Sequence, residues 1–176
     1  TDTLLKKEFD SYREIQAPHP LMVEHRINAI PFQHPELDAW RANFTGVQVH
    51  HAETNLTITG AIDDVWITPA GRLLVVDYKS TSTTKPITLK GKWKESYKRQ
   101  MEVYQWLLRQ NGFDVSDIGY FVYVNADTLL DAFNGQLIFQ THLLKHSGDD
   151  RWVEPTIVAA HACMSADEAP DANEQC

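Results

Sequence analysis

The stretch from residue 56 to residue 80 constrains the fold most strongly, because two strand-like runs flank a short turn. Residues 56–68 (LTITGAIDDVWIT) alternate apolar and polar side chains, as a half-buried strand does. Residues 72–79 (RLLVVDYK) are apolar on both faces, which is typical of a central strand covered by helices. The intervening PAG has the length and the final glycine of a common three-residue hairpin loop. The stretch therefore favours a β-hairpin inside an α/β fold.

The remaining segments place helices before, between and after strands. Apolar residues recur at helical spacing in four segments, and alternate in others. Residues 17–34, rich in Pro and His, and the polar residues 80–91 predict irregular connections. We expect helices at residues 4–16, 35–44, 94–111 and 150–164, and further strands at residues 46–51, 118–126 and 135–144. This order predicts the α/β class, with one central mixed β-sheet flanked by helices.

Length and composition indicate one globular unit. With 176 residues, 43% of them hydrophobic, we expect a single domain over residues 1–176, with a flexible acidic tail at residues 165–176. The chain starts within a helical pattern and ends on Cys176, so we expect a fragment trimmed at both ends. There is no run of membrane-spanning length, no signal-peptide pattern and no cysteine framework. These features favour a cytoplasmic (intracellular) protein without a membrane partner.

Basic residues are concentrated in one segment of an acidic chain. The net charge of −8 and the pI of about 5.4 argue mildly against a nucleic-acid partner. Residues 79–99, however, hold seven of the sixteen basic residues and a single acid, Glu95. A basic strip beside an acidic body can follow a phosphate backbone, although a solvated lysine-rich loop explains the pattern equally well. The basic strip consists of Lys79, Lys85, Lys90, Lys92, Lys94, Lys98 and Arg99.

The hairpin brings two carboxylates and a lysine together. If PAG is the loop, Thr68 faces Arg72, and counting back along both strands places Asp63 directly opposite Asp77. Lys79 projects from the same face as Asp77, two residues further on. Two converging carboxylates suit a hard divalent cation, with water and phosphate oxygens completing its coordination. The alternative is that Lys79 forms ion pairs with both acids and no metal binds.

Three motifs in this order resemble a known family. They are G-A-I-D at residues 60–63, V-V-D-Y-K-S at residues 75–80 and Q-M-E-V-Y at residues 100–104. Together they resemble the PD-(D/E)XK nuclease superfamily, and most closely its RecB-like branch, which includes the RecB nuclease domain and CRISPR-associated exonucleases. The resemblance runs from about Gly46 to Val124 and implies a restriction-endonuclease-like core.

The resemblance also implies roles for individual residues. Asp63 and Asp77 would bind the metal, with the backbone carbonyl of Tyr78 as a further ligand. Lys79 would position and help deprotonate the attacking water and offset charge on the scissile phosphate. Mg²⁺ or Mn²⁺ would generate the nucleophile and neutralise the phosphate.

A second group of residues would support that centre. Gln100 and Tyr104 are four residues apart and so share one helix face. The resemblance implies that from this face they orient the lysine or the substrate strand. The alternative is an ordinary amphipathic helix with Tyr104 in the core. We expect nucleic-acid contacts from part of the basic strip, namely Lys90, Lys92, Lys94, Lys98 and Arg99.

The chain departs from the family in two respects. Many members carry a metal-binding histidine on the first helix, whereas residues 1–16 contain none and offer Asp2 or Glu8 instead. Whether the chain has one metal site or two therefore stays open. Members with an iron–sulfur cluster hold it with one N-terminal cysteine and a C-terminal group of cysteines. The N-terminal cysteine is missing here, so a cluster would be possible only in a longer parent protein.

The sequence thus predicts a Mg²⁺- or Mn²⁺-dependent deoxyribonuclease that hydrolyses DNA phosphodiester bonds. By resemblance we expect an exonuclease acting on single strands or ends, of the kind that serves DNA repair or recombination. Protein partners in a repair, recombination or phage/CRISPR-type complex stay open. The rival hypothesis is a non-catalytic nucleic-acid-binding or assembly module that retains the nuclease fold. The intact set of Asp63, Asp77 and Lys79 argues against it, because a binding module needs no opposed carboxylates.

Overall fold

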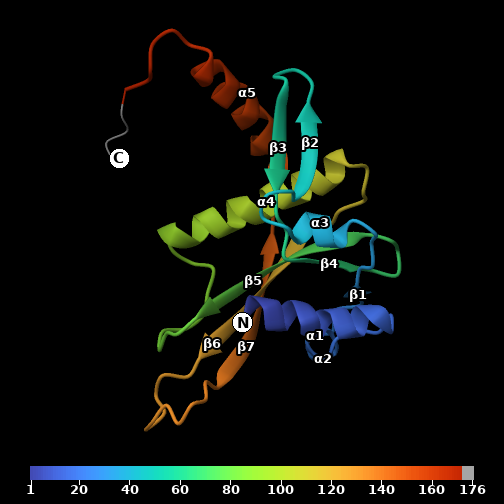
Figure 1. The fold of residues 1–176 in the computed structure, drawn as a ribbon, viewed down its shortest axis with the longest axis vertical. Helices are drawn as coiled ribbons and strands as arrows, with labels where there is room; N and C mark the ends of the chain where they lie inside the picture. Colours follow the sequence, from blue (N-terminus) through green and yellow to red (C-terminus); the bar gives the residue numbers. More distant parts are fainter. Residues whose placement is uncertain (172–176) are drawn as a thin grey trace.

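A mixed five-stranded sheet forms the centre of the computed structural model, which describes residues 1–171 (Figure 1). The strands, in spatial order, are β1 (Ile30–Pro31), β4 (Asp64–Ile67), β5 (Leu73–Thr81), β6 (Ile118–Ala126) and β7 (Phe139–Ser147). β5 and β6 run parallel, whereas the other neighbouring pairs are antiparallel. The predicted α/β class with one central mixed sheet is confirmed.

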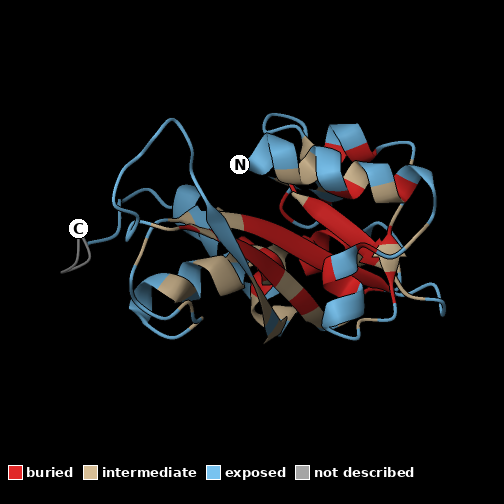
Figure 2. Ribbon diagram, turned by 90° about the horizontal axis from the view of Figure 1, so that it is seen from below, coloured by how far each residue is buried: buried red, intermediate tan, exposed pale blue. Residues whose placement is uncertain are grey.

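Helices cover both faces of this sheet (Figure 2). They are α1 (Asp2–Glu14), α2 (Pro20–Glu24), α3 (Leu37–Arg41), α4 (Glu95–Gln110) and α5 (Val153–Met164), with 3-10 turns η1 (Lys92–Lys94) and η2 (Asp150–Trp152). On one face Phe9 of α1 packs in a cluster with Trp66 and Val76. On the other, Met101 of α4 packs in a cluster with Val75. Because β5 and β6 are parallel, a crossover must connect them, and α4 lies in that crossover.

β5 is the doubly covered strand that its composition predicts. Leu74, Val76 and Tyr78 belong to the cluster beneath α1 and α2, whereas Leu73 and Val75 belong to the cluster beneath α4. Side chains alternate along a strand, so Asp77 and Lys79 continue the α4 face beyond Val75. The apolar part of β5 thus anchors the strand, and its last residues place charges at the edge of the α4 core.

Residues 56–68, predicted as one strand, form two strands in different sheets. β3 (Leu56–Gly60) pairs with β2 (Val47–His51) in a separate two-stranded sheet, and β4 begins only at Asp64. At Gly60 the backbone lies against α4, where a Cβ would come within 2.8 Å of the Tyr104 ring. The amide of Ile62 then donates to the carbonyl of Trp40 instead of to a strand. The sequence prediction of one continuous strand therefore extends across a break that packing against α4 accompanies.

The region before β1 and the start of the final strand also differ from the sequence prediction. Residues 17–34 contain α2 and β1, and the ring of His19 caps α2 by accepting from the amide of Leu21 at 3.1 Å. Pro20 occupies the first helical position, where its missing N–H costs nothing. The final strand begins at Phe139 instead of residue 135, because β6 pairs Ala126 with Phe139.

The C-terminal region follows α5. Cys163 lies exposed on this helix, and residues 172–176 of the predicted tail, including Cys176, lie outside the described residues. No helix within residues 1–171 combines the length and the apolar composition needed to cross a membrane.

Candidate active site

The β4–β5 hairpin has the predicted register. Asp64 pairs with Val76, and the Thr68 amide donates to the Arg72 carbonyl at 3.0 Å across the PAG loop. Gly71 ends that loop with φ of +80°, the left-handed conformation that glycine adopts without strain. The same register places Asp63, the residue before β4, opposite Asp77.

The carboxylate of Asp63 is held by the opposite strand. Its Oδ2 accepts a hydrogen bond of 2.8 Å from the amide of Tyr78, the residue between Asp77 and Lys79. A backbone donor fixes the carboxylate more firmly than a mobile side chain would, because the amide belongs to the β5 strand. Asp63 is therefore oriented toward the end of β5 by the hairpin itself.

Asp77 is a buried acid with incomplete compensation. Its exposed fraction is 2%, and Lys79 Nζ lies 2.5 Å from its Oδ2. Among the described residues, this ammonium is the cation that is paired with Asp77. Burial raises the pKa of Asp77 to about 6, the Lys79 ammonium opposes that shift, and the charge of Asp63 adds to it. The Lys79 ammonium therefore does not fully stabilise the buried charge of Asp77 beside Asp63.

Gln100 and Tyr104 extend the site along α4, as the sequence predicts from their spacing. Lys79 Nζ donates to Gln100 Oε1 at 3.2 Å, and Gln100 Nε2 donates to the Tyr104 hydroxyl oxygen at 2.7 Å. Lys79 also lies 4.8 Å from the centre of the Tyr97 ring, within cation–π range. Tyr104 is at the same time a core residue, and burial raises its pKa to about 12. Tyr104 is thus in the core, and its role in orienting the lysine or the substrate strand stays a prediction.

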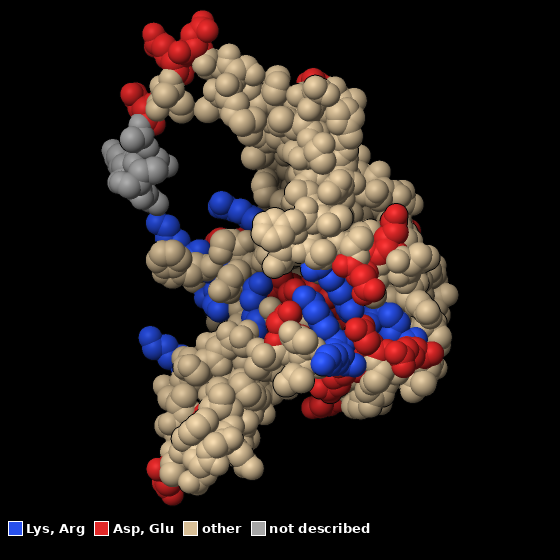
Figure 3. Space-filling model, viewed as in Figure 1, with Lys and Arg blue, Asp and Glu red and all other residues tan. Residues whose placement is uncertain are grey.

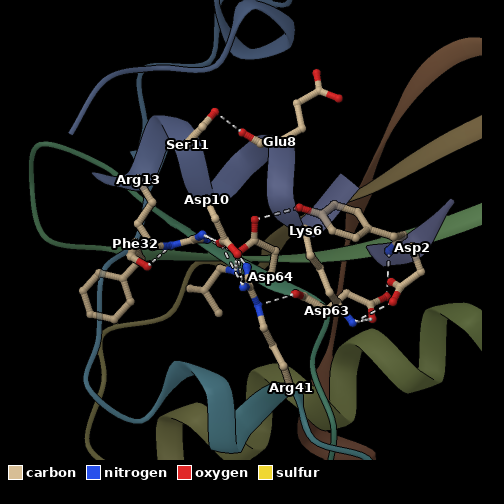
Figure 4. Close-up of polar contacts among 12 residues, drawn as sticks. Asp2, Lys6, Glu8, Asp10, Ser11, Arg13, Phe32, Arg41, Asp63 and Asp64 are labelled. Atoms are coloured by element: carbon tan, nitrogen blue, oxygen red, sulfur yellow. Dashed lines mark hydrogen bonds and ion pairs between the residues drawn. The ribbon is translucent and has the colours of Figure 1, made fainter. Parts of the chain in front are cut away.

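Lys6, on α1, is a site residue that the sequence did not single out (Figure 4). Its Nζ lies 3.2 Å from Asp63 Oδ1 and 3.1 Å from Asp2 Oδ2. Burial lowers the pKa of Lys6, but Asp63 and Asp2 outweigh it and leave the pKa raised. The spacing of four residues between Asp2 and Lys6 was visible in the sequence, whereas the contact with Asp63 was not. Glu8, the other acid considered on this helix, instead contacts His19 at 2.8 Å.

A second acid, Asp64, is fully neutralised on the opposite face of the sheet (Figure 4). It is fully buried and contacts the guanidinium groups of Arg13 and Arg41, the latter at 2.9 Å. The Tyr78 hydroxyl donates to its Oδ2 at 2.7 Å. Arg41 also donates to the Asp63 carbonyl at 3.0 Å. This network fixes the start of β4 from α1 and α3, and thereby fixes the backbone that carries Asp63.

The basic strip divides into inward and outward parts. Lys94 Nζ donates to the Tyr123 hydroxyl oxygen at 2.9 Å and lies over the Tyr97 ring that Lys79 also contacts. Lys98 pairs with Glu95 at 2.7 Å. Lys90, Lys92 and Arg99 are exposed. Figure 3 shows Lys and Arg side chains around Asp and Glu side chains at the centre of this face. The Tyr97 ring that Lys94 shares with Lys79 makes this part of the strip continuous with the site.

Trp93 is an exposed aromatic residue within this strip. Its exposed fraction is 89%, and it lines a surface hollow of about 540 Å³. Lys92 and Arg99 line the same hollow, so an indole and two basic side chains share one surface. The sequence prediction included the lysines but not Trp93. Its position between Lys92 and Lys94 was the feature of the sequence that indicated a place on this surface.

The residues present fit one hard divalent cation. Within residues 1–171 no group of three or more His, Cys, Asp or Glu side chains is placed to hold a metal. Asp63 and Asp77 nevertheless converge, and burial together with the charge of Asp63 raises the pKa of Asp77 despite the Lys79 ammonium. Mg²⁺ in proteins is commonly held by one or two carboxylates, with water and substrate phosphate filling the other positions. The donor set therefore suits such an ion better than a site built from protein ligands alone.

Comparison with known proteins agrees with this geometry. The family model of the PD-(D/E)XK nuclease superfamily matches residues 2–156, which is most of the chain. The chain belongs to the PD-(D/E)XK nuclease superfamily. Membership makes it a nuclease-type hydrolase with a nucleic-acid substrate, in a family that generally uses divalent metals such as Mg²⁺. A search of curated proteins found no match.

Proposed function

We propose that this protein is a Mg²⁺- or Mn²⁺-dependent deoxyribonuclease of the RecB-like branch, acting as an exonuclease on single strands or ends. The observation that carries the proposal is the arrangement of Asp63, Asp77 and Lys79 at the end of the β4–β5 hairpin. Two carboxylates converge there, one of them buried beside a lysine that does not fully stabilise it. The order of the three sequence motifs supports the RecB-like branch.

Asp63 and Asp77 are the proposed metal ligands, together with the Tyr78 carbonyl. A divalent cation bound there would act as a Lewis acid on water and phosphate. Lys79 is placed beside Asp77 and is held by Gln100, which in turn is held by Tyr104. In the proposal the Lys79 ammonium positions the attacking water and stabilises charge on the phosphate, and the other two residues restrict its movement.

The basic strip is the proposed path of the DNA strand. Lys90, Lys92, Lys94, Lys98 and Arg99 supply phosphate contacts, and Lys94 is linked to Lys79 through the shared Tyr97 ring. Exposed Trp93 offers a face on which an unpaired base can stack, and stacking of this kind favours single strands. This combination supports the preference for single strands or ends.

The rival function, a nucleic-acid-binding module without activity, differs in what Lys79 does. If Lys79 only neutralises buried acids, then Lys79→Met should destabilise the fold, as breaking a buried ion pair does. If it acts in hydrolysis, Lys79→Met should stay folded with saturating Mg²⁺ and still bind DNA. Its cleavage rate should then fall on the order of a hundredfold or more.

The test measures melting, Mn²⁺ affinity and single-turnover cleavage of labelled single-stranded DNA on one preparation, with EDTA as the blank. Lys145→Met is a matched control, because Lys145 is exposed and pairs with Tyr120, on the face of the sheet away from Asp77. Cleavage by Lys79→Met at the rate of the control, or unfolding despite metal, would overturn the role proposed for Lys79. Wild-type protein that binds DNA without cleaving it would favour the rival function.

A further inference from the structure

The carboxylate of Asp63 is engaged at both oxygens. Oδ2 accepts from the Tyr78 amide at 2.8 Å, and Oδ1 lies 3.2 Å from the ammonium of Lys6. The exposed fractions of the Lys6 and Asp63 side chains are 21% and 23%, so the pair is largely shielded from water. Its interaction is therefore stronger than that of an ordinary exposed pair, which is worth little.

Lys6 also contacts Asp2, so its ammonium lies between two carboxylates (Figure 4). The point between the two carboxylates is one that a metal ion would otherwise occupy. The neighbouring Lys7 is exposed on the same helix and forms no ion pair within the described residues, so the contact is specific to Lys6.

The charges around the site balance with one divalent ion. Asp2, Asp63 and Asp77 carry three negative charges, and Lys6 and Lys79 carry two positive ones. One divalent cation would turn the net charge of minus one into plus one, and one phosphodiester would neutralise it. A second divalent ion would leave two uncompensated positive charges, which a partly buried site disfavours.

We propose that Lys6 occupies, with its ammonium, the position on Asp63 that a second divalent ion would need, so that the site holds one ion. This inference rests on the proposed function and adds to it the number of metal ions and a residue that sets their affinity. Lys6 acts through Asp63 and is a positioning residue: it holds the carboxylate orientation and competes with the metal for Oδ1.

The experiment measures Mn²⁺ binding by calorimetry on wild type, Lys6→Met, Lys6→Arg and the control Lys7→Met. Wild type and Lys7→Met should bind one ion each with the same affinity. Lys6→Met should bind its first ion on the order of tenfold tighter, because Asp63 loses its competitor and the site gains negative charge. Lys6→Arg retains the cation and should stay close to wild type.

Melting in EDTA provides a second readout that does not depend on activity. Lys6→Met should melt below Lys7→Met without metal and recover with Mn²⁺, since the ion replaces the missing cation. Two Mn²⁺ ions on wild type would overturn the inference, as would a Lys6→Met affinity equal to or weaker than that of Lys7→Met. Lys6→Met protein that stays unfolded in saturating Mn²⁺ would show a purely structural lysine and would also overturn it.

These outcomes separate the inference from the proposed function. If wild type binds no Mn²⁺, or if Asp77→Asn binds it undiminished, the proposed metal centre itself is wrong. If wild type binds one ion, Asp77→Asn binds none and Lys6→Met matches Lys7→Met, only the role of Lys6 is wrong.

Discussion

Replacing Asp77 with asparagine should stabilise the metal-free protein, although it removes one partner of a buried ion pair. Burial is the largest influence on Asp77 and raises its pKa to about 6 despite the Lys79 ammonium. The folded protein therefore disfavours the ionised carboxylate, and the neutral amide removes the destabilising charge. Lys79 retains Gln100 Oε1 and the Tyr97 ring as partners.

The magnitude and its pH dependence follow from the pKa. A rise from 3.8 to about 6 corresponds to on the order of 3 kcal/mol, at about 1.4 kcal/mol per pKa unit. Because the folded protein binds this proton more tightly than the unfolded chain, wild-type stability is lost as the pH rises from about 4 to about 6. Above that window Asp77→Asn should exceed wild type by up to about 3 kcal/mol, or roughly 6–12 °C in melting temperature. Near pH 4 the two proteins should coincide.

The assay is denaturant unfolding in EDTA at several pH values between 4 and 8.5, repeated with saturating Mn²⁺. Asp114→Asn serves as the control, because Asp114 pairs with Arg72 at the exposed surface and should show no comparable change. Mn²⁺ should stabilise wild type but leave Asp77→Asn unchanged. A lower unfolding free energy for Asp77→Asn than for wild type at pH 8 in EDTA would refute the reasoning. So would a higher unfolding free energy for Asp77→Asn that persists near pH 4.

The remaining predictions concern the basic strip and the buried network. Replacing Lys90, Lys92 and Lys94 together with glutamine should weaken single-stranded DNA binding. The slope of log affinity against log salt should fall by roughly 0.7 per lost phosphate contact. An unchanged affinity and slope would mean that the strip is only a solvated loop. Asp64→Asn should destabilise the fold by about 3–5 kcal/mol at neutral pH, because Arg13 and Arg41 lose a buried counter-charge; equal unfolding midpoints would contradict the neutralisation described above.

The sequence could predict the hairpin because its information is local. The apolar run before Asp77 and the length of the PAG loop together determine which residues face each other. The same holds for Gln100 and Tyr104, whose spacing places them on one face of α4. The fold class followed from the order of such segments.

The sequence could not predict contacts that depend on how α1 and α3 pack. Lys6 reaches Asp63, and Arg13 and Arg41 reach Asp64, across long stretches of chain that carry no local signal. The break near Gly60 was missed for a related reason. It arises from close packing against Tyr104, which alternation of side chains does not report.

Asp64 and Asp77 show why one carboxylate is structural and the other suits a metal. Asp64 has two guanidinium groups and the Tyr78 hydroxyl, so its charge is matched within the fold. Asp77 has one ammonium and the charge of Asp63 nearby, so its own charge is less fully matched. The same change to asparagine should therefore lower stability at Asp64 and raise it at Asp77. A fold that neutralises one acid and leaves the other under-compensated keeps a place where a cation is stabilising, which is the property that a metal-dependent nuclease needs.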